Sequence, residues 1–129
     1  GNPGHASYGF TISDERGHLL HEEGGYIGIT TNNVAEYTAV LRALKYIKKT
    51  GEKTSQKEIL NTRIDLFADS KLVAEQLSGR FRVKAKHLKP IIEEIKILAM
   101  GLGGVTYSHI LRSRNTVADK LANQALDNR

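Results

Sequence analysis

The hydrophobic period of this chain changes near residue 31, and that change constrains the fold more than any other feature. Before it, Tyr8, Phe10 and Ile12 alternate with polar or small residues, as is typical of a half-buried strand. After it, apolar side chains recur at the spacing of one helical face, at Tyr37, Val40, Leu41, Leu44 and Ile47. The chain therefore has to pack at least one helix onto a sheet.

Strands and helices alternate along the remaining sequence. The predicted segments are strands at 7–12 and 18–30, a helix at 37–47, a polar connection at 51–58, a strand at 63–68, helices at 70–77 and 88–98, a strand at 105–111 and a helix at 117–125. The strand at 63–68 has apolar residues on both faces, which predicts a place inside a sheet covered by helices. This order indicates one α/β domain over residues 1–129, with a mixed β-sheet flanked by helices.

Composition excludes several classes of protein. The 129 residues include no cysteine, which rules out disulfide scaffolds, thiolate zinc sites and cysteine nucleophiles. No apolar run approaches the roughly 20 residues that cross a bilayer, and the first residues do not resemble a signal peptide, so we expect a cytoplasmic protein without a membrane segment. The net charge of +5 favours polyanionic partners such as nucleic acid or an acidic membrane surface, although charge alone is a weak signal.

Three acidic residues lie where α/β proteins place their chemistry. Glu36 lies early in a predicted helix, Asp69 follows a predicted strand, and Asp119 lies early in the last helix. Carboxylate oxygens are the ligands that Mg²⁺ prefers, and phosphodiester hydrolysis uses such hard cations to activate water and to neutralise the leaving oxygen.

Each acidic residue also has a structural interpretation. Glu36 stands three residues after Asn33, the spacing of a capping box, which is the favoured interpretation of that local pattern. Asp69 is equally explained as the N-cap of the next helix, and Asp119 as a charge that complements a helix dipole. Their spacing alone does not establish a metal site.

Five sequence runs, in the same order and spacing, resemble type 1 ribonuclease H in the branch common among bacteria and archaea. The resemblance covers nearly the whole chain, and it implies a ribonuclease H-like fold that cleaves the RNA strand of RNA–DNA hybrids endonucleolytically. The runs are Gly1-Asn2-Pro3-Gly4, Thr31-Asn32-Asn33-Val34-Ala35-Glu36-Tyr37, Ala68-Asp69-Ser70-Lys71-Leu72-Val73, residues 79–90 and residues 109–123.

The resemblance also implies roles for individual residues. Glu36, Asp69 and Asp119 match three of the four carboxylates that hold two Mg²⁺ ions in the family, with Mn²⁺ as the alternative ion. Products would carry 5′-phosphate and 3′-hydroxyl ends. Arg112, seven residues before Asp119, matches an arginine that assists catalysis in some members. His109 lies among core residues of its predicted strand, which favours a structural histidine.

One departure from the family concerns its fourth carboxylate. In relatives this aspartate belongs to an Asp-Gly pair on the first, central strand, a few residues before the Gly-Asn-Pro-Gly turn at which this sequence begins. We rank three explanations in the order of a longer protein, a strand supplied by another chain, and a degenerate relative. The 129 residues alone are expected to fold poorly and not to cleave, and the protein is expected to be a monomer unless another chain supplies the strand.

Candidate substrate contacts come from a basic stretch and from polar residues in the matching runs. Arg80, Arg82, Lys84 and Lys86 alternate with apolar residues, which fits a phosphate-tracking ridge or a charge-protected edge strand. In the family this stretch contacts the DNA strand. By resemblance, the RNA-strand candidates are Asn2, Asn32 and Asn33, and the phosphate candidates are Thr31, Ser70 and Lys84. The alternative to a hybrid-cleaving enzyme is a catalytically inactive nucleic-acid-binding or interaction domain of the same fold.

Overall fold

The computed structural model describes residues 3–53 and 57–129, and its elements follow the predicted order. Three 3₁₀ turns, η1 (Lys57–Asn61), η2 (Lys86–Leu88) and η3 (Arg112–Arg114), connect longer elements. The strands and helices are β1 (Gly4–Ser13), β2 (Leu19–Thr30), α1 (Asn32–Lys53), β3 (Ile64–Ala68), α2 (Lys71–Leu77), α3 (Lys89–Met100), β4 (Val105–His109) and α4 (Thr116–Asp127). The predicted α/β class, with parallel and antiparallel strands and flanking helices, is confirmed.

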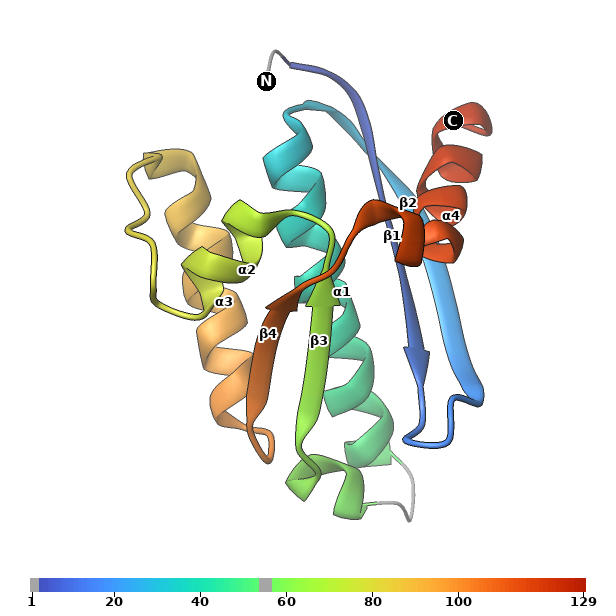
Figure 1. Ribbon diagram of the computed structural model, residues 1–129, viewed down its shortest axis with the longest axis vertical. Helices are drawn as coiled ribbons and strands as arrows, with labels where there is room; N and C mark the ends of the chain where they lie inside the picture. Colours follow the sequence, from blue (N-terminus) through green and yellow to red (C-terminus); the bar gives the residue numbers. More distant parts are fainter. Residues whose placement is uncertain (1–2, 54–56) are drawn as a thin grey trace.

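An antiparallel hairpin of β1 and β2 forms one half of the fold (Figure 1). Gly17 has a φ of +84°, and Asp14 accepts hydrogen bonds from the backbone N–H groups of Arg16 and His18, so the predicted turn is closed by its own residues. The pairing shifts by one residue near each end of the hairpin. Because of these irregularities, the register could not be predicted from the glycine-interrupted sequence.

The parallel pair of β3 and β4 forms the other half. Within the described residues no backbone pairing joins β3–β4 to β1–β2, so the sheet consists of two two-stranded parts. The predicted burial of β3 on both faces is wrong for this structure: Leu66 packs into the core, whereas Phe67, on the opposite face, is 56% exposed. The expectation that a further central strand belongs to this fold stays a prediction.

Helix α1 connects the two halves through its buried face. Val40 and Leu44 join the core cluster beneath β3 and β4, and Ala43 packs against Tyr8 and Phe10 of β1. The helix runs to Lys53, so the polar connection predicted from residue 51 begins too early. Gly51 is buried in the last turns because the Leu60 side chain occupies the space that a Cβ would need.

Helix α4 lies on the face of the hairpin opposite α1 (Figure 1). Successive strand residues point to opposite faces, so Tyr8 and Phe10 face α1 while Gly9 faces α4. A Cβ on Gly9 would collide with the Ala118 carbonyl oxygen and the Ala122 nitrogen. The glycine therefore lets α4 rest directly on β1.

No helix in the described part of the chain combines the length and the apolar character that spanning a membrane requires.

Candidate active site

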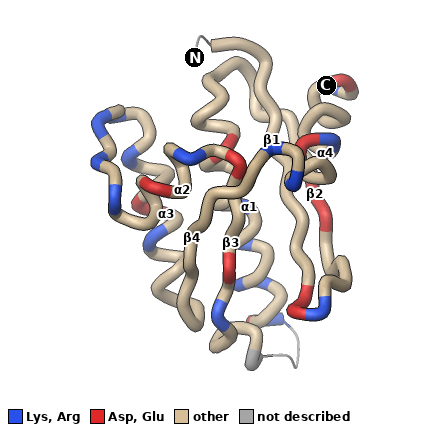
Figure 2. Tube along the Cα trace, in the orientation of Figure 1, with Lys and Arg blue, Asp and Glu red and all other residues tan. Residues whose placement is uncertain are grey.

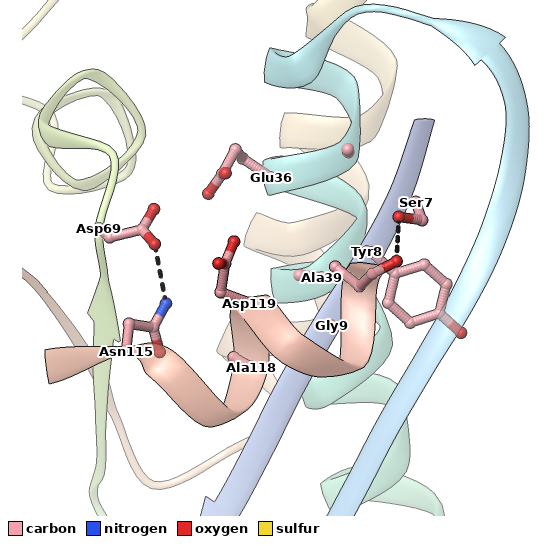
Figure 3. Close-up of a pocket in the computed structure, with 11 residues that line it drawn as sticks. Ser7, Tyr8, Gly9, Glu36, Ala39, Asp69, Asn115, Ala118 and Asp119 are labelled. Atoms are coloured by element: carbon pink, nitrogen blue, oxygen red, sulfur yellow. Dashed lines mark hydrogen bonds between the residues drawn. The ribbon is translucent and has the colours of Figure 1, made fainter. Parts of the chain in front are cut away.

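Three elements far apart in the sequence bring Glu36, Asp69 and Asp119 to one pocket (Figure 3). Glu36 comes from the beginning of α1, Asp69 directly follows β3, and Asp119 lies in the first turn of α4. Their carboxylates turn toward a shared space, which Ser7 and Gly9 of β1 also line. The pocket therefore collects all three acidic residues that the sequence singled out.

The carboxylates influence one another through this pocket. Burial, followed by the charge of Asp69, raises the pKa of Glu36 to about 7, although the Arg112 guanidinium opposes the shift. Asp119 raises that pKa further. A carboxyl group that burial and two like charges hold partly protonated is a group whose ionised form a cation would stabilise.

Asp69 is held from the side of α4. The side-chain amide of Asn115 donates a hydrogen bond of 3.1 Å to Asp69 Oδ2, and Arg112 Nε lies 4.0 Å from the same oxygen. The Asp69 side chain is 7% exposed, whereas that of Arg112 is 77% exposed. The guanidinium can therefore reach a ligand in solvent while remaining beside the acidic pocket.

The structure contradicts the capping interpretation at two positions. Thr31 Oγ1 accepts from the Val34 N–H at the beginning of α1, and Ser70 Oγ accepts from the Val73 N–H as the N-cap of α2. Glu36 and Asp69 are therefore not the caps that local spacing suggested. Asp119 does lie in the first turn of α4, where it also complements the helix dipole.

Other sequence-predicted contact residues occupy different places. Asn2 lies outside the described residues. The hydroxyl groups of Thr31 and Ser70 are engaged as helix caps, and Asn32 is exposed in the first turn of α1. Asn33 lines a second pocket together with Lys84, so the structure brings these two candidates together outside the acidic pocket.

The basic stretch is a loop between α2 and α3 rather than a strand (Figure 2). Arg82, Lys84 and Lys86 are exposed and alternate with half-buried residues, as predicted. Two details differ. Phe81 is 44% exposed, and the Arg80 guanidinium binds both carboxylate oxygens of Glu75 at 2.5 and 3.3 Å. Arg80 is therefore neutralised within the chain.

Two features of the site were missed or misjudged from the sequence. Asn115 was not singled out, although it precedes Asp119 by one helical turn, a spacing that places both at the same helix end. His109, expected in the core, is exposed, and β4 ends at this residue instead of continuing to Leu111.

The donor set fits a hard divalent cation chemically, because carboxylate oxygens from three elements face one space. Among the described residues, however, no three acidic or histidine side chains already have the spacing of a complete metal site. Binding of one ion by Glu36, Asp69 and Asp119 together would therefore require their side chains to rotate.

Known proteins resemble this chain over almost its whole length. Residues 1–125 match the family described as reverse transcriptase-like. The crystal structure of LC11-RNase H1 in complex with an RNA/DNA hybrid is 39% identical, with a TM-score of 0.90 over 99% of this chain and 90% of that one. Ribonuclease H1 of the archaeon Halobacterium salinarum is 34% identical, with a TM-score of 0.87 over 100% of this chain and 91% of that one.

Curated relatives are longer proteins. The bifunctional protein Rv2228c of Mycobacterium tuberculosis is 38% identical over 98% of this chain but only 33% of its own length. Ribonuclease HI of Halobacterium salinarum is 35% identical over 98% of this chain and 59% of its own length. The chain thus spans between a third and three fifths of these relatives. Together with the acidic pocket and the near-complete overlap with solved ribonucleases H1, these matches confirm the resemblance seen in the sequence, and the chain belongs to the type 1 ribonuclease H family.

Proposed function

We propose that this chain is the catalytic domain of an endonuclease that hydrolyses the RNA strand of RNA–DNA hybrids. The observation that carries the proposal is the joint placement of Glu36, Asp69 and Asp119 around one pocket, from three separate elements. The crystallised complex of LC11-RNase H1 with an RNA/DNA hybrid supports the same substrate class.

Glu36, Asp69 and Asp119 would hold divalent cations, two Mg²⁺ ions or alternatively Mn²⁺. Such ions, when bound, activate water and neutralise charge on the leaving oxygen, which gives 5′-phosphate and 3′-hydroxyl ends. The residues of the chain do the remaining work. Asn115 keeps the Asp69 carboxylate oriented, and the exposed Arg112 contacts a phosphate beside it.

Substrate binding would use the loop between α2 and α3 and the beginning of α1. Arg82 and Lys84 are exposed cations that attract a phosphate backbone irrespective of base sequence. Asn33 lies at the same pocket as Lys84, and its amide can both donate to and accept from a 2′-hydroxyl, the group that distinguishes RNA from DNA. The monomeric state and the cytoplasmic location stay predictions from the sequence.

A second candidate is a nucleic-acid-binding domain without catalytic activity. The lack of a ready three-ligand metal site in the described part of the chain favours this candidate. In that case the acidic residues would take no part in a reaction.

The decisive experiment compares Asp69→Asn with Asp65→Asn in the protein that contains this domain. Both aspartates belong to the same strand region, but Asp65 is exposed and bonds to Arg63 and Thr106, outside the acidic pocket. We expect Asp69→Asn to slow Mg²⁺-dependent cleavage of a labelled hybrid by about a hundredfold or more, with hybrid binding retained. Asp65→Asn should cleave normally. Unchanged cleavage by Asp69→Asn would refute the proposal, and hybrid binding without cleavage by the unsubstituted protein would support the second candidate.

A further inference from the structure

A buried side-chain amide connects the basic loop to the centre of the fold. Gln76, on α2, is 8% exposed. Among the described residues it is the one polar residue that is buried. Its Oε1 accepts a hydrogen bond from the hydroxyl of Tyr37, a fully buried residue of α1. Its Nε2 donates to the Arg82 carbonyl oxygen at 3.5 Å. One amide thus joins α1, α2 and the loop between α2 and α3.

The middle of this loop packs against the core through Val83 and Ala85 but has few backbone hydrogen bonds. At its start, the N–H groups of Arg80 and Phe81 both donate to the Glu75 carbonyl oxygen, and at its end Leu88 donates to the Ala85 carbonyl oxygen. Within the described residues, no backbone–backbone hydrogen bond outside the regular elements reaches residues 82–84. The hydrogen bond from Gln76 to the Arg82 carbonyl oxygen therefore holds the part of the loop that carries the exposed cations Arg82 and Lys84.

Gln76 also lines the pocket that these cations surround. The same pocket is lined by Asn33, Phe81, Arg82 and Lys84, so the amide lies beneath the surface that the proposed function assigns to the substrate backbone. Burial raises the pKa of Tyr37 to about 12, which keeps its hydroxyl protonated and able to donate over the whole working pH range. With Oε1 accepting from this hydroxyl, Nε2 of the same amide faces the loop.

We propose that Gln76 is a positioning residue for hybrid binding, which holds the Arg82 carbonyl so that Arg82 and Lys84 face the same groove as Asn33. This inference rests on the proposed function for its substrate, but the ordering of the loop does not depend on that substrate. Gln76 touches no reacting group, so its loss should weaken binding and leave the chemical step unchanged.

The test compares Gln76→Met with Ser78→Ala in the full protein. Methionine keeps the length of the side chain and removes both hydrogen-bonding atoms. Ser78 is the matched control, because its hydroxyl donates to the Tyr107 carbonyl oxygen at 3.1 Å and ties the same end of α2 to β4 instead of to the loop. Tyr37→Phe, which removes one hydroxyl and preserves the ring packing, decides the question if Gln76→Met does not fold.

Three measurements separate positioning from general stability. Gln76→Met should raise KM for a hybrid about fivefold with kcat unchanged, since one buried hydrogen bond corresponds to about that factor. It should also lower the salt dependence of hybrid binding, because misplaced cations neutralise fewer phosphates. Amide hydrogen exchange at residues 82–87 should become faster in Gln76→Met and not in Ser78→Ala.

The outcomes distinguish this inference from the proposed function. Normal KM, normal salt dependence and unchanged exchange at 82–87 in Gln76→Met, or in Tyr37→Phe if that variant is the one that folds, would overturn the inference. An equal rise in KM in Ser78→Ala would also overturn it, because the effect would then be one of general stability. Failure of the unsubstituted protein to cleave a hybrid would reject the proposed function, whereas the exchange measurement would still decide whether Gln76 orders the loop.

Discussion

Replacement of Glu36 by glutamine is expected to stabilise the cation-free protein at neutral and alkaline pH. The pKa of Glu36 lies at about 7 in the folded protein, above its ordinary value of 4.5, mainly because of burial and then because of Asp69 and Asp119. The folded state therefore binds a proton more tightly than the unfolded state. The contribution of Glu36 to the free energy of unfolding is therefore greatest below about pH 4.5, falls as pH rises toward 7, and stays lost above that pH.

The size of the effect follows from the difference between the two pKa values. About 2.5 pH units at 1.36 kcal/mol each give about 3 kcal/mol of destabilisation once Glu36 is ionised, and most of this develops between about pH 5 and pH 8. Glutamine has nearly the same shape and does not ionise. The variant should therefore lose this pH-dependent penalty while it keeps the packing of α1.

The assay is chemical denaturation at several pH values between about 5 and 8, with a chelator present. Glu93→Gln on the exposed side of α3 is the matched control, because its ion pair with Lys96 at 3.8 Å is exposed and contributes little. We expect the stability difference between Glu36→Gln and the unsubstituted protein to grow with pH, and that for Glu93→Gln to stay constant. Parallel pH profiles for Glu36→Gln and the unsubstituted protein would show that Glu36 is not desolvated beside the other carboxylates.

Four further outcomes are expected. Mg²⁺ should raise the melting temperature of the unsubstituted protein more than that of Asp119→Asn; an equal rise would argue against a cation in the pocket. Gly9→Ala should cost about 1–3 kcal/mol or more, measured by thermal melting, because its methyl group would push α4 off β1. Ser70→Ala should cost about 1 kcal/mol through the lost N-cap of α2. Lys84→Ala should lower the slope of the logarithm of hybrid affinity against the logarithm of salt concentration by about one. Arg80→Ala should leave that slope nearly unchanged, because Arg80 is already paired with Glu75.

Much of the architecture could be predicted from the period of the apolar residues. The alternation around Tyr8 and Phe10 and the helical spacing from Tyr37 to Ile47 mark the hairpin and α1, because these patterns depend on local geometry that every packed element must satisfy. Helix ends were predicted less well. Gly51 suggested an early end to α1, but the helix continues to Lys53, and Leu60 packs against the glycine.

The candidate site was only partly predictable. The resemblance to a family pointed to Glu36, Asp69 and Asp119, whereas local spacing favoured capping at Glu36. In the structure, Thr31 and Ser70 cap the two helices, and Glu36 and Asp69 line the acidic pocket. The ion pair between Arg80 and Glu75 could not be predicted from the sequence, because a five-residue separation across a helix end does not fix the distance between two side chains.

The sequence by itself determined the order of strands and helices, the hairpin turn, the basic stretch and the identity of the acidic residues, because these properties reside in neighbouring residues. Tertiary structure decided which of them meet. Asn115 reaches Asp69 across 46 positions, and Tyr37 reaches Gln76 across 39. The raised pKa of Glu36 likewise exists only after α1, β3 and α4 have packed together, because desolvation and charge repulsion depend on distance in space and not on distance along the chain.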